Sequence, residues 1–440
     1  MQKTILHIDF DSFFASVEQQ VNPLLRNRPI GVTATNGRTC IIAASREAKT
    51  LGIKSPSRTF EAQRRCPSII FVPAHFTLYW EISKKFINIC KDFSPFVEIF
   101  SLDEVFMDVT RTASLFGGTS GLIEKLKNRI KIEIGEYITV SFGVSHNKLL
   151  AKLASGMDKP NGLVTINPED VATIYQKAKM SDICGIGHRI EARLNDMGIY
   201  TLLKLSQTPL SVLIAEFGQA DGNFLYQVGQ GIDTRKIIPY TEAPEVKSAG
   251  RSYCLPQNEY DQRKILQNVY ELCEEVALKL RRLDRKAKGI GISLRGEKDF
   301  FGRKTFSHYM DSGRDLFEAC MTVMNQESIR QTQDKSRIRN HGSLPLIHNS
   351  SFIIPTYVRQ ISIWSFHLEK SSNTPLPLFL NEQRAQKIVS IIDRINERFG
   401  DHTLRNGFLL YANKLTTVPN GYMADRFERE KLAKEAQFNL

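Results

Sequence analysis

The chain has 440 residues, a length typical of two to four domains, and 42% of them are hydrophobic, which is enough for several buried cores. Its 59 basic and 47 acidic residues give a net charge of +12, so we expect a polyanionic partner, either nucleic acid or an acidic membrane surface. No apolar run reaches the roughly 18 residues of a membrane span, and the N-terminus lacks a signal-peptide pattern. Seven scattered cysteines match neither a disulfide framework nor a zinc site, which predicts a reduced, cytoplasmic protein.

The N-terminal residues predict an apolar strand over 3–10, ending in Asp9, and a helix directly after it. Asp11 or Ser12 stands at the position of a helix N-cap, and capping is a better interpretation of Asp11 than metal ligation. On helical spacing alone, Phe14 is an ordinary core residue.

Residues 21–74 alternate short strands with loops, and a helix of one to two turns is expected after Ser45. Arg46 and Lys49 fall on that helix. Spacing alone favours a solvated helix face for both.

An acidic hairpin is predicted between strands at 97–100 and 105–109. Along a regular strand Asp103 and Glu104 would point to opposite faces, but at a hairpin tip both can turn to one side. If the first strand lies beside this hairpin, Asp9 joins them. Carboxylates that close repel one another unless a cation sits between them, and oxygen ligands without His or Cys suit Mg²⁺. The alternative is that each acid lies alone on a solvated turn. Residue spacing alone favours the metal site and this alternative about equally.

Apolar periodicity also predicts helices at 80–93, 121–133 and 147–155 and a strand at 137–144. Lys159 lies on the loop that follows the last of these helices. Residues 180–199 resemble a helix-hairpin-helix, in which Gly185 and Gly187 leave bare backbone amides that can meet a DNA phosphate without reading sequence.

A proline-containing linker is predicted at 236–246. After it, the sequence predicts a strand, a helix (261–283), two strands (289–294 and 304–310), a helix (314–325) and a last strand (357–367). Residues 331–351 are expected to form a long loop. Basic residues accumulate here, and a DNA-backbone surface is a better interpretation than solubility alone. The residues are Arg251, Arg281, Arg282, Arg285, Lys286, Arg303, Lys304 and Arg359.

A second linker at 371–377 leads into the apolar cluster Leu376, Pro377, Leu378 and Phe379, followed by an amphipathic helix at 381–399 and a charged C-terminus. This cluster resembles the peptide by which bacterial polymerases bind the sliding clamp. A plain hydrophobic anchor is the alternative.

Five motifs in order resemble the Y-family of DNA polymerases, the lesion-bypass enzymes, and fit best its DinB (DNA polymerase IV) branch and UmuC-like relatives. They lie at 9–18, 47–53, 101–104, 142–148 and 159–162, and the resemblance spans roughly residues 3 to 370. It implies a multidomain α+β fold shaped as a right hand. Its parts would be the palm (1–20 and 75–165), small fingers (21–74), a helical thumb (166–235), the linker (236–246), a β-α-β-β-α-β little finger (247–370) and a clamp-binding-like segment with a C-terminal helical tail (371–440).

The resemblance also implies site residues. Asp9, Asp103, Glu104 and the Phe10 carbonyl would bind two Mg²⁺ ions, with Asp103 and Glu104 catalytic. The backbone amides of Phe13 and Phe14 would donate to the incoming nucleotide, and the Phe14 ring would act as a steric gate that excludes ribonucleotides. Three basic residues would offset the charge of the triphosphate. These are Arg46, Lys49 and Lys159, where Arg46 and Lys49 replace the family's usual Tyr and Arg.

The activity so implied is template-directed DNA synthesis of low fidelity, that is, translesion synthesis from dNTPs on primer-template DNA. The implied protein is a monomer that works on DNA in the cytoplasm with a sliding clamp and without a membrane. The alternative of another class is a catalytically silent accessory protein that binds DNA and the clamp. Loss of the acids would mark such a protein, and all three are present.

Overall fold

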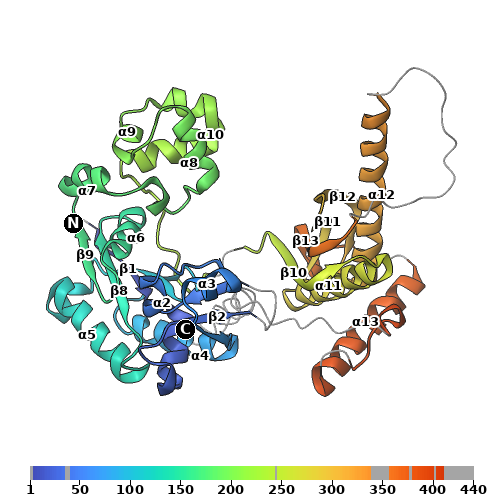
Figure 1. The fold of residues 1–440 in the computed structure, drawn as a ribbon, viewed down its shortest axis with the longest axis horizontal. Coiled ribbons are helices and arrows are strands. Elements are labelled where there is room, and N and C mark those ends of the chain that lie inside the picture. Colours follow the sequence, from blue (N-terminus) through green and yellow to red (C-terminus); the bar gives the residue numbers. More distant parts are fainter. Residues whose placement is uncertain are drawn as a thin grey trace. The chain divides into compact units, whose positions relative to one another are not determined.

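The computed structural model describes residues 3–34, 40–242, 245–337, 356–375, 379–400 and 403–410. The described residues up to 242 form one compact unit and those from 245 onward a second, so the division falls within the predicted linker. Figure 1 labels the helices and strands of both units.

A five-stranded sheet in the order β6-β7-β1-β8-β9 is the centre of the first unit. The strands are β1 (Ile5–Phe10), β6 (Val97–Ile99), β7 (Glu104–Asp108), β8 (Val140–Ser145) and β9 (Leu163–Ile166). β1 is antiparallel to both β7 and β8, and β6 and β7 form the expected hairpin. The predicted strands are therefore confirmed with small shifts at their ends.

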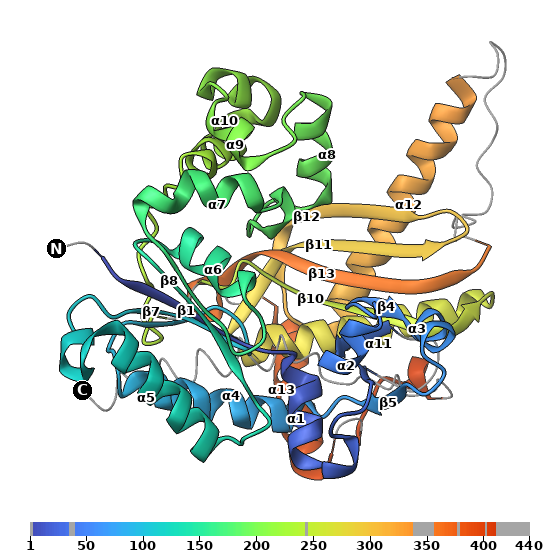
Figure 2. The ribbon, with the colours of Figure 1, turned by 60° about the vertical axis from the view of Figure 1, so that its left-hand side comes forward.

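The two faces of this sheet differ because side chains alternate along β1. Leu6, Ile8 and Phe10 enter the main core, which α1 (Phe13–Val21), α4 (Phe76–Lys91) and α5 (Gly118–Glu133) cover. Ile5 and His7 face α6 (Lys148–Met157) on the other side. Figure 2 shows α6 beside β1 and β8. Asp9 follows His7 by two residues and belongs to this second face.

A smaller sheet in the order β4-β3-β2-β5 follows the first helix along the chain. Its strands are β2 (Ile30–Thr33), β3 (Cys40–Ala44), β4 (Ser57–Arg58) and β5 (Ile70–Pro73), and its helices are α2 (Arg46–Thr50) and α3 (Thr59–Arg65). The Ser45 hydroxyl accepts a hydrogen bond from the Ala48 amide at 3.3 Å, which caps α2 where the sequence predicts its start.

Four helices complete the first unit around a separate apolar core. They are α7 (Val171–Lys177), α8 (His188–Asp196), α9 (Leu202–Ser206) and α10 (Leu210–Gly229). Gly185, with φ of +106°, turns the chain before α8, where a Cβ would also collide with the Phe224 ring.

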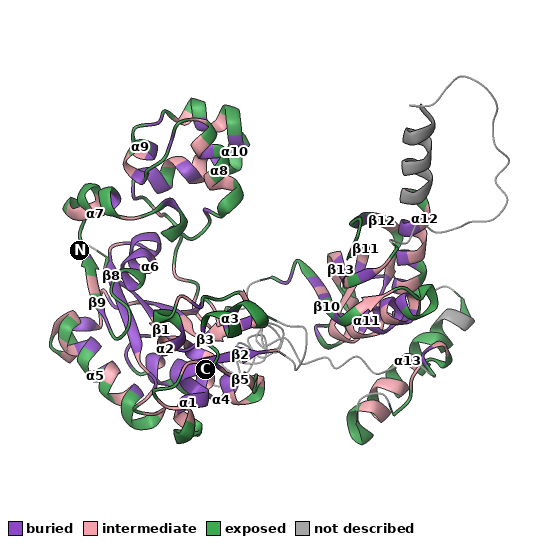
Figure 3. Ribbon diagram, viewed as in Figure 1, coloured by how far each residue is buried: buried purple, intermediate pink, exposed green. Residues whose placement is uncertain are grey.

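The second unit is a four-stranded sheet with two helices on one face. The order β10-β13-β11-β12 (Figure 2) joins β10 (Ser248–Glu259), β11 (Arg285–Gly296), β12 (Phe300–Met310) and β13 (Val358–Lys370). The helices α11 (Gln262–Arg282) and α12 (Gly313–Arg337) pack on this sheet, whose buried residues appear purple in Figure 3. The expected β-α-β-β-α-β order is confirmed.

The helix α12 corrects the prediction for residues 331–351. It continues to Arg337, so the expected loop is helical over 331–337, and the rest of that segment lies outside the described residues. The last long helix is α13 (Leu380–Phe399), which contacts α11 through an ion pair between Arg281 and Asp393.

Candidate active site

Asp9 and Glu104 are direct partners on adjacent strands. The register of β1 and β7 pairs Asp9 with Glu104, so their side chains emerge on the same face. One ligand atom each from His7, Asp9 and Glu104 lies within 4.8 Å of the other two. The expected neighbourhood of the first strand and the hairpin is therefore present.

Asp103 occupies the tip of the hairpin. Its backbone carbonyl accepts from the Phe10 amide at 3.0 Å, and its carboxylate accepts from the Ser101 hydroxyl. Burial raises the pKa of Asp103, and the charge of Glu104 raises it further. The group of three ligand atoms within 4.8 Å of one another contains His7 and not Asp103. The charge of Asp103 nevertheless acts on Asp9, and that of Glu104 on Asp103, so the convergence of the three carboxylates stays a prediction.

His7 is the residue that the sequence interpretation missed. It is fully buried, with Nε2 3.0 Å from Glu104 Oε2 and Nδ1 2.7 Å from Ser155 Oγ. Burial lowers the pKa of His7 and favours the neutral ring. The Nε2–H then donates to Glu104, and the Ser155 hydroxyl donates to Nδ1. Its place two residues before Asp9, on the same strand face, was the available signal.

Glu104 is held as a carboxylate. Burial acts to raise its pKa, but the hydrogen bond from His7 and the charge of Lys152 outweigh it and lower the pKa to about 2. Lys152 also donates to the same Oε2 that His7 contacts. Glu104 is therefore ionised and fixed in place throughout the neutral range.

Cations surround the carboxylates. Lys159 Nζ lies 2.6 Å from Asp9 Oδ1, and Lys49 Nζ donates to Ser12 Oγ at 2.7 Å. Burial lowers the pKa of Lys49, and the positive charge of Lys159 adds to this effect. Arg46 donates to the Thr139 hydroxyl. The predicted basic residues of the nucleotide site thus lie close to the predicted acids.

Asp11 does not cap the helix. The N-cap position of α1 is Ser12, whose side chain makes no capping bond, so the capping interpretation of Asp11 is wrong. The buried Asp11 carboxylate instead accepts from Thr139 Oγ1 at 2.6 Å, Ser141 Oγ at 2.8 Å and the Asn161 amide at 2.8 Å. These contacts tie β8 to the loop that follows Lys159.

The two aromatic residues at the start of α1 differ in burial. Phe13 is buried and stacks on Phe10, with ring centroids 4.8 Å apart. Phe14 is half-buried and stacks on Tyr79, with centroids 4.4 Å apart and an interplanar angle of 14°. The Phe14 ring is therefore packed against Tyr79 and stays partly accessible.

The predicted DNA-contacting residues of the second unit fall into two groups. Arg251 is buried with Nε 2.7 Å from Glu275, and Arg281 binds Asp393 through two nitrogens at 2.5 and 2.7 Å. Other residues of the set have weaker contacts or are exposed. Lys286 lies 3.6 Å from Asp311, Arg285 binds backbone carbonyls, Lys304 lies over the Phe306 ring, and Arg282, Arg303 and Arg359 are exposed.

Only part of the clamp-like cluster is described. Leu376, Pro377 and Leu378 lie outside the described residues. Phe379 directly precedes α13 and is 69% exposed.

Comparison with known proteins covers most of the chain. Residues 8–156 match the impB/mucB/samB family, residues 181–233 the DNA polymerase-iota thumb domain, and residues 246–343 the impB/mucB/samB family C-terminal domain. A DNA polymerase IV of Pelotomaculum thermopropionicum is 33% identical over 433 residues, which covers 97% of this chain and 98% of the relative. Another, from Moorella thermoacetica, is 37% identical over 412 residues, which covers 92% and 96%.

A solved structure gives the same result. A Y-family DNA polymerase chimera of Dbh and Dpo4 superposes with a TM-score of 0.67 at 26% identity, covering 83% of this chain and 98% of that one. The fold and these matches define a DNA-directed DNA polymerase with palm, small fingers, helical thumb and little finger. The chain belongs to the Y-family, in the DinB-type branch whose named members here are DNA polymerase IV. Among the described residues, no helix is long and apolar enough to cross a membrane.

Proposed function

We propose that this chain extends a primer across damaged template by transferring a nucleotide from a dNTP to the primer 3′-hydroxyl, with two Mg²⁺ ions bound to the palm. The observation that carries the proposal is the pairing of Asp9 with Glu104 on one sheet face, beside Lys49 and Lys159. Carboxylates bind cations, and lysines offset the charge of a triphosphate. Both are needed for phosphoryl transfer.

The donor set fits a hard divalent cation. Asp9 and Glu104 present carboxylate oxygens on one face, and burial raises the pKa values of both Asp9 and Asp103, so a bound cation would relieve the cost of their charges. Asp9, Asp103, Glu104 and the Phe10 carbonyl would be the ligands. When bound, the ions would lower the pKa of the primer hydroxyl and neutralise charge on the leaving phosphates.

The protein side chains fix this geometry. His7 and Lys152 hold Glu104 by its Oε2, so the carboxylate is already oriented before substrate binds. Lys159 pairs with Asp9 and can turn to the β- and γ-phosphates once Asp9 has a cation. Lys49 and Arg46 would contact the triphosphate from the fingers side, and the first amides of α1, at Phe13 and Phe14, would donate to it.

Binding of DNA is proposed to be independent of sequence. The turn at Gly185 and Gly187 would contact phosphates from the thumb, and the exposed basic residues of the little finger would contact the duplex backbone. We further propose low fidelity from the small fingers, docking on a bacterial sliding clamp through 376–379, and a monomer working on DNA in the cytoplasm.

Primer extension with Mg²⁺ and dNTPs tests the site. Asp103→Ala and Glu104→Ala are each expected to lower the extension rate about 100-fold or more, because a lost ligand removes transition-state stabilisation. Binding of primer-template should change little, since it depends on phosphate contacts elsewhere. Asp108→Asn is the matched control, because Asp108 lies at the far end of β7 and accepts from Thr110.

Near-normal extension by both alanine variants would remove Asp103 and Glu104 from the site. Absence of extension by the unmodified chain, with DNA binding intact, would instead indicate the catalytically silent accessory protein.

A further inference from the structure

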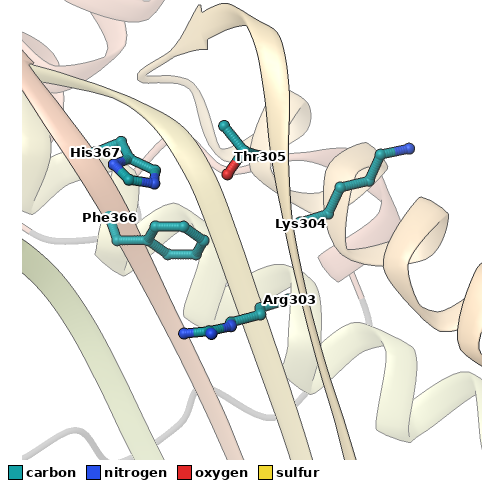
Figure 4. A pocket seen from close by; sticks show the side chains of 5 residues that line it. All are labelled: Arg303, Lys304, Thr305, Phe366 and His367. Carbon is teal, nitrogen blue, oxygen red and sulfur yellow. The ribbon is translucent and has the colours of Figure 1, made fainter. Parts of the chain in front are cut away.

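The pocket of the second unit belongs to the DNA surface proposed above. It has a volume of about 440 Å³ and is lined by Arg303, Lys304, Thr305, Phe366 and His367 (Figure 4). In the figure Arg303 lies beside the Phe366 ring, whereas Lys304 points away from it. Both basic residues are among those proposed to contact the duplex backbone, so the pocket is an extension of that surface.

Asp11 of the first unit, in contrast, is a buried carboxylate to which the proposed function gives no role. It is only 3% exposed. Its Oδ2 accepts hydrogen bonds from Thr139 Oγ1 at 2.6 Å and the Asn161 amide at 2.8 Å, and its Oδ1 accepts from Ser141 Oγ at 2.8 Å. A buried charge is costly unless hydrogen bonds compensate it, and these three donors do so. Both oxygens already have donors, which disfavours metal ligation, the alternative that the sequence leaves for Asp11.

The bond from Thr139 connects Asp11 to the fingers. The Asp11 amide also donates to the Thr139 carbonyl at 2.9 Å, so the two residues are paired through both backbone and side chain. A hydroxyl has one proton, and Thr139 donates its proton to Asp11, so the hydroxyl oxygen accepts from the Arg46 guanidinium. Arg46 is the first residue of α2. Asp11 thus fixes, through one hydroxyl, where the Arg46 side chain is held.

The bond from Asn161 connects Asp11 to the loop that carries Lys159. The backbone of Asn161 is held at both ends, because its amide donates to Asp11 and its carbonyl accepts from Lys127 Nζ at 2.7 Å. Asn161 has a φ of +58°, which is uncommon for residues other than glycine, so these two bonds stabilise an unusual turn. Lys159 lies two residues earlier, with Nζ 2.6 Å from Asp9 Oδ1. The position of Lys159 therefore depends on the bonds at Asn161.

Both connections end at a basic residue of the proposed nucleotide site. Arg46 comes from the fingers and Lys159 from the palm, and positioned charges of this kind provide most of the catalysis of phosphoryl transfer. A displacement of about 1 Å in a positioning group is enough to lower its effect strongly. Since one carboxylate holds the supports of both residues, a change at Asp11 displaces both charges together.

We propose that Asp11 is a positioning residue, which sets Arg46 and Lys159 relative to each other around the triphosphate of the incoming nucleotide. It acts through the Thr139 hydroxyl and the Asn161 amide and touches neither the nucleotide nor the reacting atoms. This role rests on the nucleotide site proposed above. It concerns the affinity for dNTP and leaves the affinity for primer-template unchanged.

Equilibrium binding of dNTP tests this role in the full chain. On a dideoxy-terminated primer-template with Mg²⁺, the complementary dNTP binds without reacting, so its Kd is measured without catalysis. Asp11→Ala removes the acceptor of all three donors and should weaken this Kd about tenfold, because both basic residues lose their fixed positions. The Kd for primer-template should stay unchanged, since it depends on phosphate contacts elsewhere.

Asp11→Asn is the matched variant that keeps the geometry without the charge. An amide oxygen in place of Oδ2 accepts from Thr139 and Asn161, and the amide nitrogen can donate to the Ser141 hydroxyl. The Kd for dNTP and the extension rate should therefore stay close to those of the unmodified chain. A metal ligand would behave differently, because a neutral amide in its place would lower extension as strongly as Asp103→Ala.

Two further variants separate positioning from folding. Thr139→Val removes the connection to Arg46 and keeps that to Lys159, so it should have half of the free-energy effect, a Kd for dNTP weaker by about threefold. Ser94→Ala removes another buried hydrogen bond of the palm, from Ser94 Oγ to the Asp108 carbonyl at 2.6 Å, and should leave this Kd unchanged. Melting temperatures identify the folded variants, and Thr139→Val decides the question if Asp11→Ala does not fold.

The role of Asp11 is overturned if folded Asp11→Ala or folded Thr139→Val binds dNTP like the unmodified chain, or if Asp11→Asn loses extension like Asp103→Ala. A chain that binds dNTP but extends no primer would contradict the function proposed above, and the Kd values would still decide the role of Asp11. A chain that binds no dNTP would contradict both.

Discussion

A single carboxylate oxygen organises the residues of the active site. Glu104 Oε2 receives hydrogen bonds from His7 and Lys152, and His7 is in turn fixed by Ser155. Each of these groups is buried or half-buried, so removing one partner would leave another unsatisfied, at a cost of about 1–3 kcal/mol. Orientation of the proposed metal ligand Glu104 and stability of the palm are therefore coupled.

Phe14 is expected to discriminate between sugars. Its half-buried ring is stacked against Tyr79, and we predict that a 2′-hydroxyl of an incoming nucleotide would collide with it. Phe14→Ala should raise ribonucleotide incorporation at least about tenfold relative to deoxynucleotide incorporation, measured as the ratio of the two kcat/KM values.

Phe76→Ala is the control for that variant, because Phe76 contacts both Phe14 and Tyr79 edge-on. It should leave the ratio unchanged. An unchanged ratio in Phe14→Ala as well would make Phe14 a core residue and nothing more.

Among the elements, helix α6 does the most to build the site. Lys148, Lys152 and Ser155 recur on one helix face and reach Glu98, Glu104 and His7 on three neighbouring strands. The helix can approach so closely because β8 has glycine at 143, where a Cβ would lie 3.0 Å from the Ala151 carbonyl carbon. One helix thus holds β6, β7 and β1 in the arrangement that the active site needs.

Two adjacent arginines at the end of α11 have different surroundings. Arg281 is bound to Asp393 of α13, whereas Arg282 is exposed. Arg282→Gln should therefore reduce the slope of log K against log salt for duplex binding by about 0.9, the contribution of one phosphate contact. Arg281→Gln should leave the slope unchanged and instead loosen α13, and an equal drop in both variants would contradict this assignment.

Lys279 of α11 predicts a pH dependence of stability. Its Nζ donates to the Gly250 carbonyl at 3.0 Å, and burial, followed by the charge of Arg251, lowers its pKa from 10.5 to about 8. Between these pH values the unfolded chain binds the extra proton, so folding becomes more favourable as pH rises from 8 to 10.5. The gain is about 3 kcal/mol at most, since one pKa unit corresponds to about 1.4 kcal/mol.

The test compares unfolding free energies of the unmodified chain and Lys279→Met across this range. The unfolding free energy of the unmodified chain should rise with pH relative to that of Lys279→Met. Relative to that of Lys264→Met, a change at an exposed position of the same helix, it should stay constant. A pH-independent difference would mean that Lys279 keeps an ordinary pKa.

For the whole molecule, the segment at 376–379 predicts a partner. An apolar peptide next to a polar helix can insert its side chains into a preformed pocket, and each buried side chain contributes roughly 1.5–3 kcal/mol. Ordering of the chain offsets part of this, so we expect a micromolar Kd, about −8 kcal/mol. Loaded clamp should lengthen the extension products of the unmodified chain by raising the effective concentration of DNA.

The double variant Leu378→Ala with Phe379→Ala should lose this stimulation. Phe399→Ala, an exposed ring at the other end of α13, should keep it. Equal stimulation of all three proteins would make the segment a hydrophobic anchor without a partner role.

The amino-acid sequence is sufficient to predict the main helices and strands and the class of enzyme. Alternating apolar residues predict β1 and the hairpin, because burial of one face imposes a period of two, and the β-α-β-β-α-β order follows from the same periodicities. Asp9 at the end of an apolar strand and the acids of the hairpin tip mark the site, and the ordered motifs indicate the Y-family. Each of these signals is local in the chain.

The partner of each polar group, in contrast, follows from the folded chain. Asp11 has the chemistry of a cap and directly precedes the N-cap residue Ser12, yet it binds Thr139, Ser141 and Asn161, more than 120 residues away. His7 meets Glu104, and Trp364 lies on Gly291, through packing that no local period encodes. A side chain's choice between a neighbour in the chain and a distant partner depends on which one burial brings within hydrogen-bonding distance, and that is a property of the folded chain alone.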